Sequence, residues 1–577
     1  MASPSADLSA RASWVVLALA LVAYLGLAWR QSDAFMAWDE ETMVHSVAAP
    51  RVLAGRPGPD GRPRLEPSCA DAHAPTFVLS SGRPRLGVCA AGRLWPLMIA
   101  PYFSGVFYWP FGLLAPLHHD NVFVLRKFTL LMGALTLALT FLLVRRLAGR
   151  RAAALAAVAT AVSPCFVLTH SILVHFETLP WMWLTAAMLV LAGRSPSDAP
   201  PSSRRLTLGG FLVGLAVLAN LKTVALIAPL ALVAWRLDPR WRQLPLRRWI
   251  TTAAAAALPL LPMVIVYLLP SGDYGDKSQG WSRSLVAHLL QPQRLVPSTR
   301  DLLLWWSNVA YYFRDFVASA PLNVAALAVA VGALAFALRD AARTLWRREG
   351  DAVTAACGAS LASYVAMVAL LYESFPVNYT PLHTVFGVTL AVAVDRASQA
   401  VARRASRPSL ALPLALVALA PFFHNTVQTT EASRGFRLRT NPITERALVA
   451  YLRAHPAPGA RIVTVDDRMA GVVDSLSDGE LTTTQAGGYF RSCDPHTSNP
   501  RAQECLYERW RALLSATPGP LRVVMPLDVL TWRSGYVSLA PSLQRAAREL
   551  GREVAVEREF VTAGGLPAVA LHRIGGR

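Results

Sequence analysis

Long apolar runs separated by short arginine-rich segments dominate this chain from Ser13 to Phe423. Most are about 15–22 residues long, close to the length that crosses a bilayer as a helix. With the N-terminus placed in the cytoplasm, we expect about eleven spans and a retained, uncleaved first span. The predicted spans are 13–30, 126–144, 152–168, 177–193, 207–220, 221–236, 250–270, 322–338, 352–372, 381–397 and 408–423.

One apolar segment, 93–119, does not fit a straight span. Its prolines at 96, 101, 110 and 116 would break a helix at several points. If this segment were a span, the arginine clusters of all later loops would move to the outer face. We therefore expect interfacial or re-entrant structure in 93–119.

The pattern changes after Asn425, where short elements replace the apolar runs. An amphipathic helix is expected at 444–455 and another helix at 541–551. Strand-like runs alternate with these helices, which is typical of a small α/β domain. We therefore divide the chain into a membrane domain, 1–425, and a soluble domain, 426–577. The predicted strands are 460–467, 521–528, 553–561 and 567–574.

The charge distribution indicates a membrane protein rather than a nucleic-acid-binding one. The 577 residues are 54% hydrophobic and only 16% charged, and the net charge is +20. The arginines gather in short loops between apolar runs, as expected of cytoplasmic loops. This topology predicts a multi-pass cell (inner) membrane protein with the soluble domain outside the cytoplasm. The predicted outer loops are 31–125, 169–176 and 271–321.

The cysteines support the same topology. Cys69 and Cys89 share the first outer loop, and Cys493 and Cys505 share the tail. Two local pairs favour two disulfides in an oxidising compartment. A zinc site is the alternative, although neither pair has Cys-x-x-Cys spacing.

Three carboxylates, Asp39, Glu40 and Glu41, follow the first span on the predicted outer face. Acidic residues at a membrane edge are costly and are therefore functional candidates. Asp39 could also cap a helix, with both glutamates in its first turn. Because consecutive side chains point in different directions, one or two of the three can face a common site. We select Asp39 for chemistry, with Glu40 in support.

Basic residues on the same face supply candidate phosphate contacts. Lys222 lies between two apolar runs with almost no loop, so a solvated loop position is excluded. It could bind a lipid phosphate, or extend to the headgroups along the membrane edge. Arg126 and Lys127 open the second span and could either contact the phosphate or anchor that span.

His170, His175 and Glu177 surround the second outer loop. These residues could be metal ligands, but nothing in the sequence fixes a third or fourth ligand. We favour a role for Glu177 in orienting a sugar or supporting Asp39, with His175 as a further substrate contact. No cofactor is expected with certainty, and a divalent cation stays open.

Carboxylates and cations at one membrane edge fit sugar transfer from a polyprenyl-phosphate carrier. A carboxylate would take the proton of an acceptor hydroxyl, and cations would stabilise the departing phosphate. A transporter or flippase is the alternative, but it would carry charges deep in several spans or show repeated halves. A non-catalytic scaffold that presents the tail is the third possibility.

Four stretches resemble the GT-C superfamily of integral-membrane glycosyltransferases, within it family 39 and the protein O-mannosyltransferases. The acidic motif WDEE lies at 38–41, an arginine-led second span at 124–151, a Ser-Pro-bounded span with an acidic loop at 163–183, and a Gly-Leu-Ala…Lys hairpin at 209–223. The resemblance covers roughly 13–425 and implies a GT-C-like fold of about eleven spans.

The resemblance also implies roles for individual residues. Asp39 matches the catalytic base, Glu177 the acidic position of the second loop, and Arg126 and Lys222 basic positions near the lipid phosphate. Family members often carry an Arg-Tyr pair before a late span, where this chain has Asn378 and then Tyr379. The implied donor is an undecaprenyl- or decaprenyl-type phosphate sugar carrying a hexose or pentose. The acceptor would be a glycan, lipid or protein outside the cytoplasm, with membrane lipids as neighbours.

Overall fold

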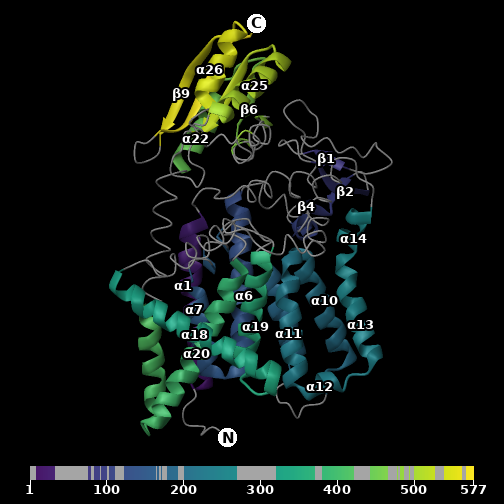
Figure 1. The fold of residues 1–577 in the computed structure, drawn as a ribbon, viewed down its shortest axis with the longest axis vertical. Helices are drawn as coiled ribbons and strands as arrows, with labels where there is room; N and C mark the ends of the chain where they lie inside the picture. Colours follow the sequence, from purple (N-terminus) through teal and green to yellow (C-terminus); the bar gives the residue numbers. More distant parts are fainter. Residues whose placement is uncertain are drawn as a thin grey trace. The chain divides into compact units, whose positions relative to one another are not determined.

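The computed structural model of the chain contains a mainly helical part and a part built on a mixed β-sheet (Figure 1). It divides into two compact units, one of Met1–Ser32, Ala100–Ser104 and Arg126–Ala432, the other of Asp33–Ile99, Gly105–Leu125 and Ser433–Arg577. The predicted division at 425/426 stays a prediction. The structure describes residues 8–32, 76–78, 84–90, 93–100, 103–110, 122–163, 166–167, 170–171, 179–192, 200–268, 320–370, 380–421, 442–465, 469, 473, 477, 481, 483–485, 493, 500–526, 539–561 and 567–576.

Helices make up most of the first unit, and each predicted span contains one. Their bounds are α1 (Ala10–Ser32), α6 (Val122–Ala148), α7 (Arg150–Ala161), α9 (Leu179–Leu191), α10 (Ser203–Ala219), η3 (Leu221–Thr223), α11 (Val224–Leu237), α12 (Pro239–Arg242), α13 (Leu246–Ala257), η4 (Leu258–Leu260), α14 (Leu261–Leu268), α18 (Ala320–Arg347), α19 (Ala352–Leu370), α20 (Thr380–Arg404) and η6 (Pro408–Leu410).

Three helices in the described ranges are long and apolar enough to cross a membrane: Ala10–Arg30, Arg126–Ala148 and Thr384–Arg404. Shorter apolar helices include Leu179–Leu191, Ala352–Ala366 and Pro408–Pro421. The chain is therefore an integral membrane protein with several apolar helices, and the finer count of about eleven spans stays a prediction.

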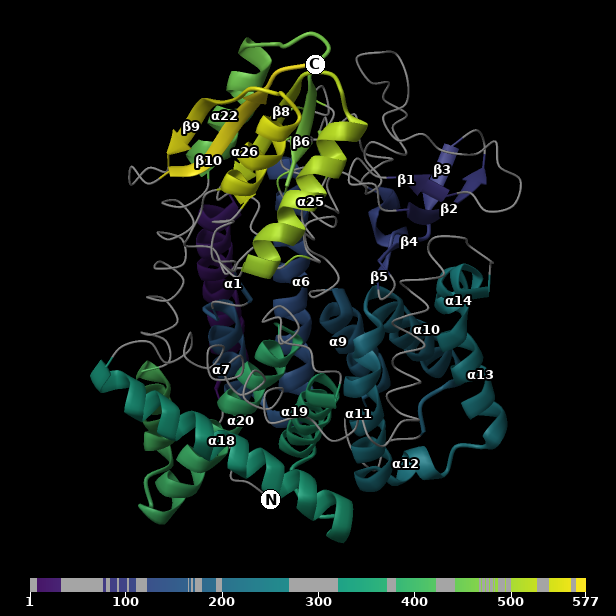
Figure 2. The same cartoon turned by 45° about the horizontal axis from the view of Figure 1, so that its top comes forward.

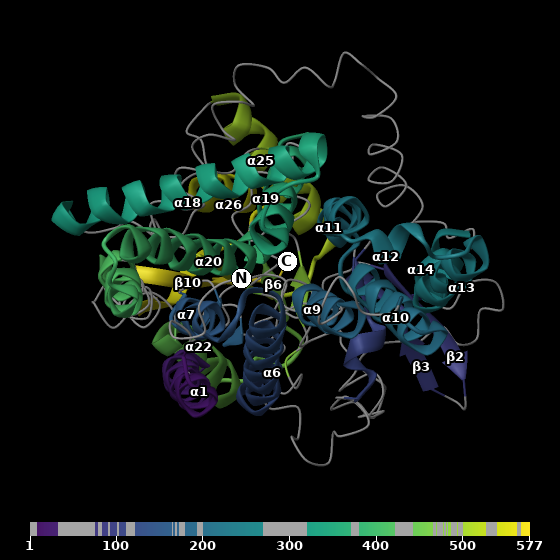
Figure 3. The same cartoon turned by 90° about the horizontal axis from the view of Figure 1, so that it is seen from below.

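Small side chains allow the first helices to pack closely. Almost every residue of the alanine-rich helix α7 is buried, and α7 packs against α1 and α20. Alanine combines high helix propensity with a side chain small enough for close approach between membrane helices. Seen from below, α1 and α6 are viewed end-on while α18 and α20 are viewed from the side, so these two pairs are inclined to each other (Figure 3).

The described part of 93–119 contains no membrane-spanning helix. It forms the strands β3 (Arg93–Pro96), β4 (Met98–Ala100) and β5 (Phe103–Ser104), followed by η2 (Val106–Tyr108). This agrees with the expectation that the prolines prevent a straight span. Strand β3 pairs with β2 (Pro84–Ala90), which pairs with β1 (Thr76–Val78), both antiparallel.

The C-terminal part is an α/β structure, as the alternating pattern predicts. Its five-stranded sheet has the order β7-β6-β8-β10-β9, with β6 parallel to β7 and β8, and β10 antiparallel to β8 and β9. Helices α25 and α26 pack on one face (Figure 2). The bounds are α22 (Pro442–Ala454), β6 (Arg461–Thr464), β7 (Thr483–Gln485), α25 (Pro500–Ala516), β8 (Leu521–Pro526), α26 (Leu539–Glu549), β9 (Val554–Val561) and β10 (Pro567–Ile574).

One of the two predicted disulfides is present. Cys493 is bonded to Cys505, the latter on α25, and Cys493 is buried in the core beneath the sheet. Cys89 lies on β2, whereas Cys69 lies outside the described residues, so the pairing of those two stays a prediction.

Candidate active site

Arg126 and Lys127 hold the end of α1 against the beginning of α6. The Arg126 side chain is fully buried and donates from Nη1 to the carbonyl oxygen of Ser32 at 2.7 Å. Lys127 donates from Nζ to the Ser32 hydroxyl, and its ammonium lies 3.6 Å from the centroid of the Trp29 ring. The last carbonyls of a helix lack partners within the helix and carry partial negative charge. The two cations therefore cap α1, which favours the anchoring interpretation; a phosphate contact stays a prediction.

This contact also defines the base of the first predicted outer loop. Ser32 is the last residue of α1, and Arg126 is separated from it by 94 positions. The hydrogen bond therefore joins the two ends of the long segment that contains Asp39. Bringing together the two ends of so long a segment costs conformational entropy, and the contacts of Ser32 with Arg126 and Lys127 help to offset that cost.

Lys222 occupies a break between two helices. Asn220 ends α10 in an extended conformation, with φ −156° and ψ 120°, and its side chain accepts a hydrogen bond from the Lys222 backbone nitrogen at 3.0 Å. Asparagine is a preferred residue for starting a new helical segment in this way. The Lys222 side chain is only 5% exposed. Burial in the protein argues against the alternative in which Lys222 extends along a lipid-facing surface.

His170 lies in the helix bundle rather than in an open loop. Its ring packs on Phe166 and Tyr24, with centroid distances of 4.2 and 6.2 Å. A β-carbon at position 133 of α6 would overlap Tyr24 and approach His170, so this crossing requires Gly133. Nδ1 of His170 lies 2.8 Å from the Phe166 carbonyl, which can only accept, so Nδ1 carries the proton. Nε2 is left as a buried acceptor with no partner among the described residues.

The remaining predicted site residues lie outside the described residues. These are Asp39, Glu40, His175, Glu177 and Tyr379, and their roles stay predictions. Among the residues that the structure does describe, no group of three or more His, Cys, Asp or Glu side chains could hold a metal ion.

Residues 104–267 match the family model of dolichyl-phosphate-mannose-protein mannosyltransferases. This segment includes Arg126, Lys127, His175, Glu177 and Lys222. No curated protein matches the chain significantly in sequence.

Solved structures extend the similarity over almost the whole chain. ArnT from Cupriavidus metallidurans in the apo state has a TM-score of 0.53 and 15% identity, covering 98% of both chains. The Archaeoglobus fulgidus oligosaccharyltransferase tethered to an acceptor peptide has a TM-score of 0.56 and 13% identity, covering 97% of this chain and 74% of that one. The same organism's AglB, with an inhibitory peptide and a dolichol-phosphate, has a TM-score of 0.51 and 14% identity, covering 93% and 72%.

The chain has the fold of the GT-C membrane enzymes ArnT and AglB, and its residues 104–267 match the mannosyltransferase family model. The resemblance predicted from the four sequence stretches is therefore confirmed. At 13–15% identity the solved structures establish the fold, and donor and acceptor belong to the proposal below.

A second polar network, which sequence analysis did not predict, joins helices of the GT-C fold where α7 begins. Arg151 of α7 forms a buried ion pair with Asp395 of α20, and Gln399 donates to the same carboxylate at 2.7 Å. Buried charges require such partners because desolvation is otherwise costly. Arg396, the next residue of α20, pairs with a different partner, Asp351.

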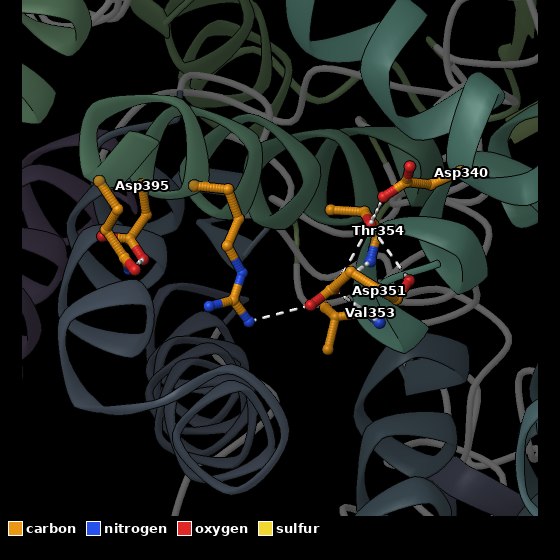
Figure 4. Close-up of polar contacts among 7 residues, drawn as sticks. Asp340, Asp351, Val353, Thr354 and Asp395 are labelled. Carbon is orange, nitrogen blue, oxygen red and sulfur yellow. Dashed lines mark hydrogen bonds and ion pairs between the residues drawn. The ribbon is translucent and has the colours of Figure 1, made fainter. Parts of the chain in front are cut away.

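The network continues through α19 to α18 (Figure 4). Arg396 donates to Asp351 at 2.9 Å, and the Asp351 carboxylate accepts from the backbone nitrogens of Val353 and Thr354 at 3.1 Å each, capping α19. The Thr354 hydroxyl donates to Asp340 of α18 at 2.8 Å. These ion pairs and hydrogen bonds hold α7, α18, α19 and α20 together. We therefore interpret them as structural contacts between helices rather than as part of a catalytic site.

Proposed function

We propose that the chain is an inverting glycosyltransferase that moves a sugar from a polyprenyl phosphate to an acceptor outside the cytoplasm. The observation that carries this proposal is the buried Lys222 at the α10–α11 break, inside the segment matched by the mannosyltransferase family. A buried ammonium in a helix break is suited to an anionic group such as a lipid phosphate. That one GT-C relative was solved with a dolichol-phosphate supports this donor class.

The proposed reaction displaces the lipid phosphate from the anomeric carbon. Asp39 takes the proton of the acceptor hydroxyl as its oxygen attacks, with Glu40 in support. The bond between the anomeric carbon and the phosphate oxygen breaks, and its electron pair leaves with the phosphate. Lys222 stabilises the charge that grows on this leaving group, while Glu177, His175 and Tyr379 orient the sugar.

We place the soluble domain outside the cytoplasm. The Cys493–Cys505 disulfide supports this side, because structural disulfides persist in oxidising compartments. The net positive arginine segments between the apolar runs support it independently. An acceptor glycan, lipid or protein would then approach from the side of this domain.

Substitution of Lys222 tests the proposed phosphate contact. We expect Lys222→Ala to lower kcat about 10²–10³-fold, the usual loss for one charge-stabilising group, and Lys222→Arg to retain most of it. The measurement is transfer from radiolabelled polyprenyl-phosphate sugars by the full chain in liposomes. Arg404→Gln is the control and should keep the wild-type rate, because Arg404 is an exposed cation at the end of α20 that has no proposed role in the site. Equal rates for wild type and Lys222→Ala would refute the contact, and labelled lipid flipped without transfer would favour the flippase.

A further inference from the structure

We propose that the C-terminal turns of α18 bind the headgroup of an anionic phospholipid. Arg339, Arg343 and Arg347 recur every four residues there, so each is about 6 Å further along the helix axis than the last. All three are exposed, and Trp346 beside them is 82% exposed. This surface, Arg339–Arg343–Trp346–Arg347, does not depend on the proposed sugar transfer.

The position of the arginines on α18 suits the boundary between lipid tails and headgroups. Val331 and Leu338 are 57% and 39% exposed and form an apolar face that leads toward Trp346. At about 100° per residue, Trp346 and Arg339 lie roughly 80–100° around the helix from Leu338. Arg343 and Arg347 lie further round, about 140° and 180° from Leu338, so the arginines form a separate stripe that begins next to Trp346. Exposed tryptophan is typical of the headgroup level of a bilayer, and arginine extends from there to lipid phosphates.

Other arginines near this end of the helical unit have protein partners. Arg151, Arg240 and Arg396 pair with Asp395, Asp238 and Asp351. Arg205 donates to the carbonyl oxygens of Val190 and Ala192. The guanidinium groups of these four arginines therefore already bind carboxylates or carbonyl oxygens of the protein.

The arginines of the proposed surface are different. Arg343 and Arg347 have no hydrogen bond or ion pair with any residue that the structure describes, and Arg339 lies 3.6 Å from Asp340. Arg236 of α11 donates to the carbonyl oxygen of Leu345 and so offsets the negative end of the α18 dipole. A phosphate diester can therefore bind the exposed guanidinium groups of Arg343 and Arg347, each of which can donate two hydrogen bonds. Arg236 reduces the repulsion that the negative end of the α18 dipole would otherwise exert on this phosphate.

Lipid binding to the purified full chain tests this surface directly. Native mass spectrometry would measure the dissociation constant of the first bound phosphatidylglycerol and, separately, of phosphatidylcholine. We expect the wild type to bind phosphatidylglycerol at least tenfold more tightly. The double variant Arg343→Gln/Arg347→Gln should weaken phosphatidylglycerol binding roughly 30-fold and leave phosphatidylcholine unchanged, which also reports an intact fold.

The matched control is Arg404→Gln/Arg407→Gln, which removes the same charge from two exposed positions, the last residue of α20 and a residue three positions beyond it. This pair should change phosphatidylglycerol binding less than twofold. Equal weakening by both double variants would mean diffuse attraction to a basic face and would overturn the site. The proposal also fails if wild type does not distinguish the two headgroups, or if Arg343→Gln/Arg347→Gln binds phosphatidylglycerol as wild type does.

Discussion

Arg126 and Lys222 are both buried cations, yet their surroundings differ in a way that separates their expected roles. Arg126 donates to the carbonyl oxygen of Ser32 and completes a helix end. Lys222 interrupts a helix pair, and Asn220 holds its backbone. An interruption of regular structure within a membrane domain is tolerated where it lines a functional cavity or is buried in protein. The donor phosphate therefore stays the proposed partner of Lys222, whereas the contact of Arg126 with Ser32 positions the base of the first loop.

The sequence pattern points to Lys222, but it does not predict that Arg126 contacts Ser32. Lys222 stands out because it interrupts two adjacent apolar runs. Ser32 gives no such signal, because its two basic partners lie 94 and 95 positions away in the chain. A pairing between distant segments depends on how the helices pack, which apolar periodicity does not specify. The Arg151–Asp395 pair, 244 positions apart, was missed for the same reason.

We expect the C-terminal β-sheet to lose stability in acid because of the buried residue His572. The residue is 3% exposed on β10, and neither ring nitrogen has a hydrogen-bond partner among the described residues. Burial lowers the pKa of His572 below the ordinary value of 6.5, while Glu559 opposes the shift. Above pH 6.5 the imidazole is neutral in both states, so it adds no pH dependence. Below pH 6.5 the unfolded chain binds the proton first, and the domain loses stability as the pH falls.

Hydrogen exchange of β8 and β10 in the full chain measures this effect. Protection should fall between pH 6.5 and 5 in the wild type by more than the intrinsic exchange rate explains. His572→Leu should flatten that dependence, and Glu559→Gln should steepen it. An unchanged pH dependence in His572→Leu would assign the acid sensitivity to another group.

The contact of α10 with α13 depends on Gly210 and Gly214, spaced as in small-xxx-small membrane helix pairs. A β-carbon on either glycine would overlap a backbone carbonyl oxygen of α13, that of Thr252 or Ala256. We expect Gly214→Ala to destabilise the helical unit by about 1–3 kcal/mol, the usual cost of overpacking. Gly332→Ala is the matched control, since its β-carbon would meet nothing within 4 Å, and it should be neutral or slightly stabilising. Thermal unfolding in detergent compares them, and equal midpoints would show that α13 moves aside at little cost.

The helices of the apolar runs follow from the sequence pattern, as do α22, α26 and the strands β6, β8, β9 and β10. The sequence pattern did not single out α25, β7 or the short strands of the first loop. The long apolar runs indicate helices by their length, and the amphipathic 444–455 stretch does so by its helical period. Strands β1 to β5 in the first loop are short and interrupted by proline and glycine, so no periodicity identifies them. The strand order β7-β6-β8-β10-β9 could not be predicted from the hydrophobic pattern either, because tertiary contacts determine which strands pair.

The sidedness of the whole molecule is a prediction that cysteine labelling can test. In sealed, right-side-out membrane vesicles, a membrane-impermeant maleimide should label Arg548→Cys on the exposed face of α26. The same reagent should not label Arg407→Cys, which follows α20, until the vesicles are opened. The native Cys493–Cys505 disulfide and buried Cys357 contribute little background, and labelling of the parent chain measures the background from Cys69, Cys89 and Cys165. Labelling of Arg407→Cys alone would invert the topology and remove Asp39 from the outer face.

Asp39 is the group that we propose removes the acceptor proton during sugar transfer from a polyprenyl phosphate. The most direct measurement is single-turnover transfer by the reconstituted full chain, comparing wild type with Asp39→Asn, which retains the side-chain size. We predict a loss of about 10²–10⁴-fold in the rate with donor binding unchanged, because only proton removal is lost. Transfer by Asp39→Asn at the wild-type rate would show that Asp39 is not the base.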